Sequence, residues 1–416
     1  MRRSLRIQWI VLAVIVSSAC FGGEPSWARF RGPNGSGQSD FANIPLKWTI
    51  KDYRWRVELP GVGHSSPVVC GDRVVVTSAD EKDATLIVLC LQASDGRRLW
   101  RHDLSARVYA KSSLNTYASS TPALDTEHAY VASTTPEQYT VVSLDLKDGR
   151  RVWRRELGPY DSEHGFGASP IVWEDLLIVP NDQDGPSSVF ALDRATGVTR
   201  WRVERRVEKA AFATPCIFHR DGEKPQLILS SWANGVTSLD PRTGKRNWEL
   251  PVFQCRVVGS PMVAAGMVFA AAGGGGIGRQ MVAIRPGDPG QATEAKVVYR
   301  IETAIPYVPT PVAKGNLVFL WQDHGIVSCL DAPTGKVHWR ERVGGDYFSS
   351  PVRVGDRIYC PSRTGEMLVL AASERYQLLA RFPLGERTHS TPALANGRMY
   401  LRTVSHLMVI EGNGKE

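Results

Sequence analysis

The chain repeats one pattern eight times over its 416 residues. Successive copies begin 40 to 55 residues apart, and each interval alternates short apolar runs with Gly- and Asp-rich turns instead of a helical pattern. A period of this size predicts a β-propeller in which each copy forms one blade. Every copy opens on a Ser-Pro or Thr-Pro pair, whose prolines are Pro67, Pro122, Pro170, Pro215, Pro261, Pro311, Pro351 and Pro392.

The sixth copy shows how one repeat can form a four-stranded blade. Its apolar runs LVFLW and IVSCL are separated by a polar turn, and a second turn ends at Gly335, a residue suited to positive φ. The following segment, KVHWRERV, alternates in polarity as an outer strand does. We expect its four antiparallel strands near 311–313, 317–321, 326–330 and 336–343.

A tryptophan stands at a fixed distance after the turn in five of the copies. A large flat ring at one repeated place can bury its area against the neighbouring blade. Five equivalent catalytic tryptophans would have no chemical use, so we interpret the motif as structural. These tryptophans are Trp100, Trp153, Trp201, Trp248 and Trp339.

The two ends of the repeat region complement each other. The eighth copy supplies only three strands, over 390–410, whereas 53–60 resembles the closing strand of a blade, with Trp55 at the tryptophan position. Pairing these segments would close the ring and remove an exposed sheet edge. We therefore predict an all-β, eight-bladed propeller that is closed by pairing an N-terminal strand with the C-terminal blade.

The N-terminal segment 1–23 has a cationic start, a short apolar core and small residues before its end, which is the layout of a secretory signal peptide. The apolar core is short for a membrane span, so export is favoured over anchoring. Cys20 follows two small residues and allows a second outcome, lipidation at that cysteine. We expect an exported protein, periplasmic or extracellular, with an irregular arm at 24–47, the propeller at 48–411 and a tail at 412–416.

Charge and cysteine content narrow the class of protein. The net charge is +8, but the basic residues are scattered along the repeats, which favours a mildly basic surface over nucleic-acid binding. The six cysteines after Cys20 form neither a Cys-x-x-Cys motif nor a vicinal pair, and most lie inside apolar runs. We expect mostly free, buried thiols.

The phrase Ala191-x-Asp193-x-x-Thr196-Gly197-x-x-x-Trp201 resembles the repeat of pyrroloquinoline quinone (PQQ) type propellers, with close variants at 238–248 and 329–339. The resemblance extends over 48–411. Within that group the length and the eight-fold count look like the BamB-like exported propellers of bacteria. The resemblance implies a binding or scaffolding module of the cell envelope, with envelope proteins, a peptide or a glycan as partner. We expect a monomer that is at most peripheral to the membrane.

The resemblance does not bring the quinone with it, because the repeat describes how blades pack. Quinoprotein dehydrogenases of this type add acid and amide ligands for Ca²⁺, and many also have a vicinal disulfide; no such ligand set or Cys-Cys pair is recognisable in this sequence. We expect no cofactor and no metal, and we assign no catalytic residue. Two alternatives stay open: a PQQ-dependent oxidoreductase of alcohols or sugars, and a glycan-binding accessory protein.

Blade topology indicates where a ligand would bind. The segments that enter the first strands and the turns between the second and third strands lie on the same face of a propeller. Aromatic and histidine residues recur there, whereas the opposite face carries ordinary turns. Such a ring predicts an axial funnel for a ligand or peptide, although the same aromatics could instead plug the channel. The candidate residues are His64, Tyr117, His164, Phe212, Trp232, Tyr307, Asp323, His324 and His389.

Overall fold

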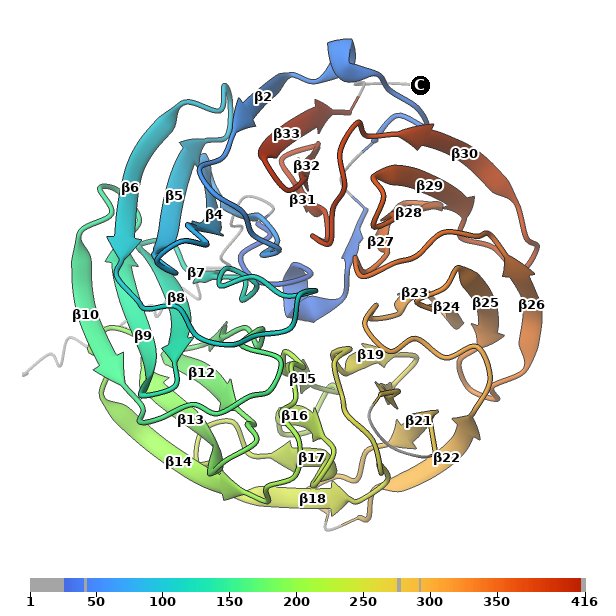
Figure 1. Cartoon of the computed structure of the whole chain (residues 1–416). Helices are drawn as coiled ribbons and strands as arrows, with labels where there is room; N and C mark the ends of the chain where they lie inside the picture. Colours follow the sequence, from blue (N-terminus) through green and yellow to red (C-terminus); the bar gives the residue numbers. More distant parts are fainter. Residues whose placement is uncertain (1–25, 41–42, 275–277, 292, 413–416) are drawn as a thin grey trace, which may run out of the picture.

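The protein, described here by a computed structural model, is resolved over residues 26–40, 43–274, 278–291 and 293–412. These residues form eight four-stranded antiparallel blades around one axis, which confirms the predicted fold (Figure 1). In each blade the first strand lies nearest the axis and the fourth strand forms the rim. The predicted signal segment, 1–23, lies outside the described residues.

Blades 1 to 4 follow the order of the repeats. Their strands are β3 (Val68–Cys70), β4 (Arg73–Ala79), β5 (Leu86–Gln92) and β6 (Arg98–Leu104) in blade 1, β7 (Ala123–Leu124), β8 (His128–Thr135), β9 (Gln138–Asp145) and β10 (Arg151–Glu156) in blade 2, β11 (Ile171–Trp173), β12 (Leu176–Asn181), β13 (Ser187–Asp193) and β14 (Thr199–Arg205) in blade 3, and β15 (Cys216–Phe218), β16 (Gln226–Ser231), β17 (Gly235–Leu239) and β18 (Arg246–Leu250) in blade 4.

Blades 5 to 8 complete the ring. Their strands are β19 (Met262–Ala264), β20 (Met267–Ala272), β21 (Gln280–Arg285) and β22 (Lys296–Ile301) in blade 5, β23 (Val312–Lys314), β24 (Leu317–Trp321), β25 (Ile326–Asp331) and β26 (Val337–Arg342) in blade 6, β27 (Val352–Val354), β28 (Arg357–Pro361), β29 (Glu366–Ala371) and β30 (Leu378–Pro383) in blade 7, and β31 (Ala393–Ala395), β32 (Arg398–Arg402), β33 (His406–Glu411) and β2 (Trp55–Glu58) in blade 8.

Blade 8 is shared between the two ends of the chain. Strand β2 pairs antiparallel with β33, with Trp55 opposite Val409 and Glu58 opposite His406, as the sequence predicts. The pairing gives β33 a neighbour on its outer side and makes blade 8 equivalent to the others (Figure 1). The chain ends are therefore held together by a sheet, and the ring has no open junction among its described blades.

The rim tryptophans hold neighbouring blades together. Trp100 of blade 1 lies on the turn glycine of blade 2, Gly149, which has φ +76° and whose missing Cβ would stand 2.6 Å from the indole ring. The indole N–H donates to the Leu146 carbonyl at 3.0 Å. Only glycine fits this turn, because it needs both the left-handed backbone and the contact. The same donor-to-carbonyl arrangement in the next blade occurs at Trp55, Trp153, Trp201 and Trp339.

Trp248 of blade 4 differs from the other tryptophans of the motif. It is only partly buried, and its indole donates at 2.7 Å to Gln226, a residue of its own blade. Blade 5 lacks the Asp-x-x-Thr-Gly turn of the blades that receive Trp153 and Trp201. Tyr299 takes the tryptophan position in blade 5 and donates at 2.6 Å to the Ala332 carbonyl of blade 6.

The core lies between the blades, where the inner strands meet their neighbours. Strands such as β12 and β20 are buried along their whole length, whereas rim strands such as β22 alternate between exposed and partly buried residues. Cys90, Cys216, Cys255, Cys329 and Cys360 are buried free thiols, and burial raises the pKa of Cys90 to about 12. Among the described residues, no helix has the length and apolar character needed to cross a bilayer.

The arm that precedes the ring runs through its middle. Its short elements, the 3₁₀ turn η1 (Pro33–Gly35) and β1 (Gln38–Ser39), lie near the axis in Figure 1. Strand β1 adds to blade 7 as a parallel fifth strand beside β27. A second 3₁₀ turn, η2 (Ile50–Asp52), leads from the arm to β2. The sequence predicts an irregular arm but gives no sign of this position.

Candidate functional site

The Ser/Thr residues that begin the eight repeats meet at the axis. All eight are at least 90% buried, and all eight line the same central cavity. Serine and threonine alternate strictly from blade to blade, so that small and larger side chains share the narrow space. We call this ring the collar; its residues are Ser66, Thr121, Ser169, Thr214, Ser260, Thr310, Ser350 and Thr391.

Hydrogen bonds connect the collar from blade to blade. The backbone N–H of Ser66 donates to the Thr121 hydroxyl at 3.0 Å, and Thr391 donates back to Ser66 at 3.2 Å across the closure of the ring. Seven of the eight junctions have this bond. At the eighth, between Ser169 and Thr214, no such bond is formed. The repeated hydroxyl therefore satisfies a backbone donor that would otherwise be buried and unpaired.

The arm closes the axis on one side of the collar. Trp27 pairs with Val69 of blade 1 through two backbone hydrogen bonds of 2.9 and 3.0 Å. Arg31 is fully buried and donates to the carbonyls of Pro311 and Pro351 at 2.6 and 2.9 Å, in blades 6 and 7. These prolines follow two collar residues directly, so the Arg31 guanidinium lies beside the collar. Burial lowers the pKa of Arg31 to about 9, which leaves it charged at neutral pH.

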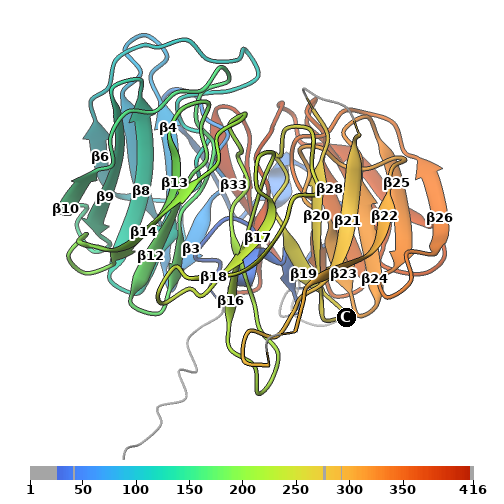
Figure 2. The ribbon, with the colours of Figure 1, turned by 90° about the horizontal axis from the view of Figure 1, so that it is seen from below.

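The other side of the collar opens into a cavity of about 310 Å³. Phe30 of the arm, the collar and the segments that enter the first strands line this cavity, and in the part of the chain that the structure describes no Asp, Glu, Lys or Arg is among the lining residues. The side view shows long connecting segments rising above the ring over the early blades, coloured blue-green (Figure 2). The aromatic rings and imidazoles that line the cavity belong to Phe30, His64, His164, Phe212, Tyr307, Phe348 and His389.

Five of the nine candidate residues predicted from the sequence line this cavity. They are His64, His164, Phe212, Tyr307 and His389. The blade-topology argument thus places the entry segments correctly, because each of them leads into a collar residue.

The other four candidate residues lie elsewhere. Tyr117 contacts Tyr109 edge-on and carries the Lys111 ammonium 4.6 Å from its ring centroid. His324 is largely exposed and pairs with Asp346 at 2.8 Å. Asp323 is buried behind the wall, where it accepts hydrogen bonds from the N–H groups of residues 307 and 308. Trp232 is not among the lining residues; it lies in the turn between β16 and β17.

Two histidines of the wall lie against each other. The ring centroids of His64 and His389 are 4.2 Å apart, and Phe348 contacts His389 edge-on at 4.9 Å. Burial, followed by the charges of His389 and Arg402, lowers the pKa of His64 to about 2. Burial and the Arg363 charge lower the pKa of His389 to about 4. Both imidazoles are therefore neutral at neutral pH and are weak proton acceptors.

The glycine run of blade 5 has a role at the cavity. Tyr307 lies against Gly273 and Gly274, where an added Cβ would stand 2.8 and 2.4 Å from the tyrosine side chain. The run therefore lets the backbone approach an aromatic wall residue. Sequence reasoning did not detect this contact, since Tyr307 belongs to the next repeat.

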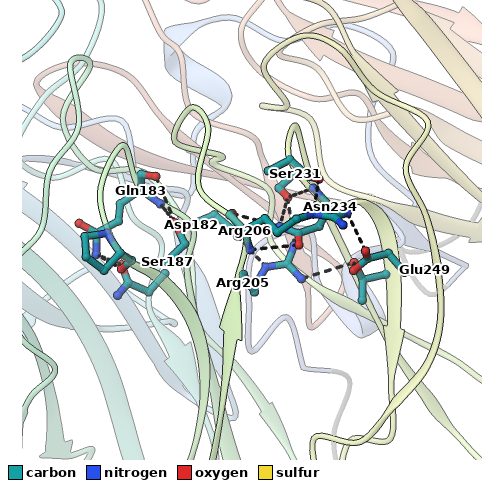
Figure 3. A network of polar contacts seen from close by, with 12 residues as sticks. Asp182, Gln183, Ser187, Arg205, Arg206, Ser231, Asn234 and Glu249 are labelled. Carbon is teal, nitrogen blue, oxygen red and sulfur yellow. Dashed lines mark hydrogen bonds and ion pairs between the residues drawn. The ribbon is translucent and has the colours of Figure 1, made fainter.

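A second polar network joins blades 3 and 4 behind the wall (Figure 3). Arg205 donates to Asp182 at 2.6 Å and to Ser231 at 3.1 Å, and both members of the ion pair are buried. Gln183 closes the neighbouring turn through the Pro186 carbonyl at 2.8 Å. The ion pair with Arg205 gives Asp182 a structural role. The described residues contain no group of three His, Cys, Asp or Glu side chains that could hold a metal ion.

The lining does not match the needs of a quinone enzyme. Asn115 carries the one amide side chain of the lining, and its Nδ2 donates to the carbonyls of His164 and Phe166 at 2.8 and 3.2 Å. None of the described residues that line the cavity is a carboxylate that could ligate a cation or accept a substrate proton. The residues present therefore do not fit a quinone with its metal, and we derive no redox step through one.

Comparison with known proteins gives one family over most of the chain. A family model described as "Outer membrane protein assembly factor BamB" matches residues 50–159, 86–305 and 298–410. The BamB proteins of Salmonella typhimurium and Escherichia coli are 24% and 25% identical over 269 and 296 residues, which are 62% and 68% of this chain. The alignments span 65% and 71% of those relatives, so this chain covers just under two thirds of the first.

Other similar proteins include dehydrogenases. A polyvinylalcohol dehydrogenase of Pseudomonas sp is 25% identical over 52% of this chain and 33% of its own length. Among solved structures, BamB from Moraxella catarrhalis has a TM-score of 0.62 at 17% identity, covering 87% of this chain and 99% of that one. A quinohemoprotein alcohol dehydrogenase from Comamonas testosteroni has 0.68 at 14% identity, covering 94% and 81%. At these identities the structural likeness shows the fold alone.

Proposed function

The chain belongs to the family of the outer membrane protein assembly factor BamB, and from this membership we propose that it is an exported binding and scaffolding module of the cell envelope. The observation that carries the proposal is the axial cavity, whose wall is aromatic and neutral. Apolar walls with a few polar groups are typical of ligand pockets. Its partner is an envelope protein, of which a peptide segment enters the cavity.

The apolar surface beside the mouth of the cavity supports a protein partner. The connecting segment 105–122 joins blades 1 and 2 and carries two exposed apolar side chains, Val108 at 55% and Leu114 at 46% exposure. Leu114 also lines the cavity, so the apolar surface continues from the cavity onto the connecting segment 105–122. Exposed apolar groups next to a concave site favour a protein–protein contact over a purely solvated surface.

A photo-crosslinker placed on the two faces of the ring tests the proposal. We expect p-benzoylphenylalanine at position 114 to give a specific adduct with an envelope protein in the native cell. The matched control is position 198, an aliphatic residue at the Thr-Gly turn of the opposite face with 53% exposure. The adduct at 114 should exceed that at 198 by roughly tenfold, because the partner covers one face only.

Equal labelling at 114 and 198, or no protein adduct at either position, would contradict the proposal. Retention of the protein by an envelope polysaccharide without a protein adduct would instead support the glycan-binding alternative.

The oxidoreductase alternative is tested by dye reduction with added PQQ and Ca²⁺ over a panel of alcohols and aldoses. We expect no turnover above the protein-free rate, because the described lining of the cavity offers no carboxylate as base and its paired histidines have a pKa of about 2 and about 4. A well-characterised quinoprotein dehydrogenase serves as the positive control. Turnover that depends on both PQQ and Ca²⁺ would establish the alternative.

A further inference from the structure

The collar has hydrogen-bond donors that the protein does not use. Each of seven collar hydroxyls accepts a backbone N–H from the neighbouring blade, but none of the eight donates its own proton to an acceptor among the described residues. All eight residues are at least 90% buried and line the cavity. Buried hydroxyl protons require acceptors, so the collar is a ring of O–H donors around an axial position that an acceptor group can occupy.

Buried cations surround the same position without matching anions. Arg31, on the far side of the collar, donates to four carbonyls, and Arg402 donates to Ser65 and Ser78, next to the start of the collar. Arg29 donates to the Pro215 carbonyl at 2.5 Å. None of the three takes part in an ion pair with a described carboxylate. These carbonyl and hydroxyl acceptors leave the net positive charge uncompensated, and the buried Nε–H groups of Arg29 and Arg402 have no partner among the described residues.

The carboxylates near the cavity already accept hydrogen bonds from other groups or form ion pairs with them. Asp323 accepts two backbone N–H groups behind Tyr307, and Asp182 is paired with Arg205. Glu163 is exposed beside His164, where it forms ion pairs with Arg256 and Lys209. The low pKa values of His64 and His389 arise from burial and neighbouring cations, which is consistent with a positive potential in the cavity.

We propose that the collar binds a carboxylate, and that the apolar body attached to this carboxylate lies in the aromatic cavity above it. The hydroxyl donors supply hydrogen bonds to the oxygens, and the buried guanidiniums supply the compensating charge. Phe30, Phe212 and Phe348 offer the surface for the apolar body. The inference deepens the proposed function, because it names the ligand chemistry of the same cavity.

Two sources can present this chemistry: a free aromatic or aliphatic acid, and the C-terminal carboxylate of a peptide. Calorimetry on the purified mature chain separates them with 3-phenylpropionate against 3-phenylpropionamide, and with acetyl-Ala-Ala-Phe as the free acid against its C-terminal amide. Within at least one pair we expect the acid to bind roughly tenfold or more tightly than its amide, because only the acid compensates the cations. Binding confined to the first pair identifies a small-acid site, and binding confined to the second identifies a chain-terminus site.

Thr214→Val is the sharpest variant, because Thr214 is the one collar residue whose hydroxyl accepts no N–H from its neighbour. The substitution removes a donor of the collar, keeps the side-chain shape and leaves no backbone group newly unpaired. We expect acid binding to weaken about fivefold and the unfolding midpoint to stay close to that of the unsubstituted protein. Thr140→Val, at a buried threonine of β9 outside the cavity, should change binding less than about twofold.

Equal affinity for acid and amide, absence of binding by both acids, or unchanged binding in Thr214→Val would each overturn the inference. These outcomes are separable from a failure of the proposed function. An envelope adduct at position 114 together with no acid binding rejects the carboxylate site alone. Acid binding without any protein adduct rejects the protein partner and leaves the carboxylate site.

Discussion

A chain that lacks residues 26–60 is expected to show no cooperative unfolding transition. The deletion removes β2, so the outer edge of β33 loses its partner and blade 8 keeps three strands. It also removes Trp55, whose ring lies on the turn glycine of blade 1, Gly96. Burying one tryptophan ring contributes roughly 5 kcal/mol of transfer free energy, which is comparable with the net stability of many domains. Urea unfolding followed by circular dichroism and tryptophan fluorescence measures the outcome.

Deleting only the part of the arm that lies in the axis is the matched control for this experiment. A chain without residues 26–40 keeps β2 and the closure of blade 8, so it should still unfold cooperatively, at a lower urea midpoint because the axial contacts of the arm are lost. If the two deletions unfold at the same midpoint and with the same cooperativity, β2 does not close the ring.

Local sequence signals sufficed to predict the fold. The prolines of the Ser/Thr-Pro pairs set the repeat, the turn glycines and rim tryptophans set the blade junctions, and Trp55 marked 53–60 as a missing fourth strand. Each signal repeats along the chain, so a single weak pattern was strengthened by the other copies. Blade 5 shows the limit of this reasoning, because a copy that lacks the usual turn leaves Trp248 with a different partner.

The site was predicted less completely, because its contacts join distant residues. The entry segments were placed at the axis from topology alone, but side-chain direction in the turns was not predictable: His324 points to Asp346 at the surface. The strict Ser/Thr alternation was visible in the sequence, yet its function follows only from the bonds between neighbouring blades. The arm gave no signal at all, since Arg31 finds its acceptors 280 and 320 residues away.

Arg31→Ala is expected to detach the arm from the axis while the ring itself stays folded. The guanidinium donates to four carbonyls, of Gly35, Ser36, Pro311 and Pro351. Without it, these carbonyls are buried and unpaired, at roughly 1–3 kcal/mol each. The arm can avoid this penalty by detaching, which lets water reach the carbonyls, so the loss is limited by the free energy with which the arm docks. We expect the free energy of unfolding to fall by about 3 kcal/mol.

Limited trypsin digestion followed by mass spectrometry tests this directly, because detachment exposes the peptide bond after Arg29. That bond should be cut much faster in Arg31→Ala than in the unsubstituted protein, while fragments from within the blades stay absent. Arg54→Ala is the control: its guanidinium forms a half-exposed pair with Glu411, so its removal should cost less than about 1 kcal/mol and leave the digestion pattern unchanged. Equal cutting rates in all three proteins would mean that apolar packing of Trp27 and Phe30, and not the buried guanidinium, keeps the arm in the axis.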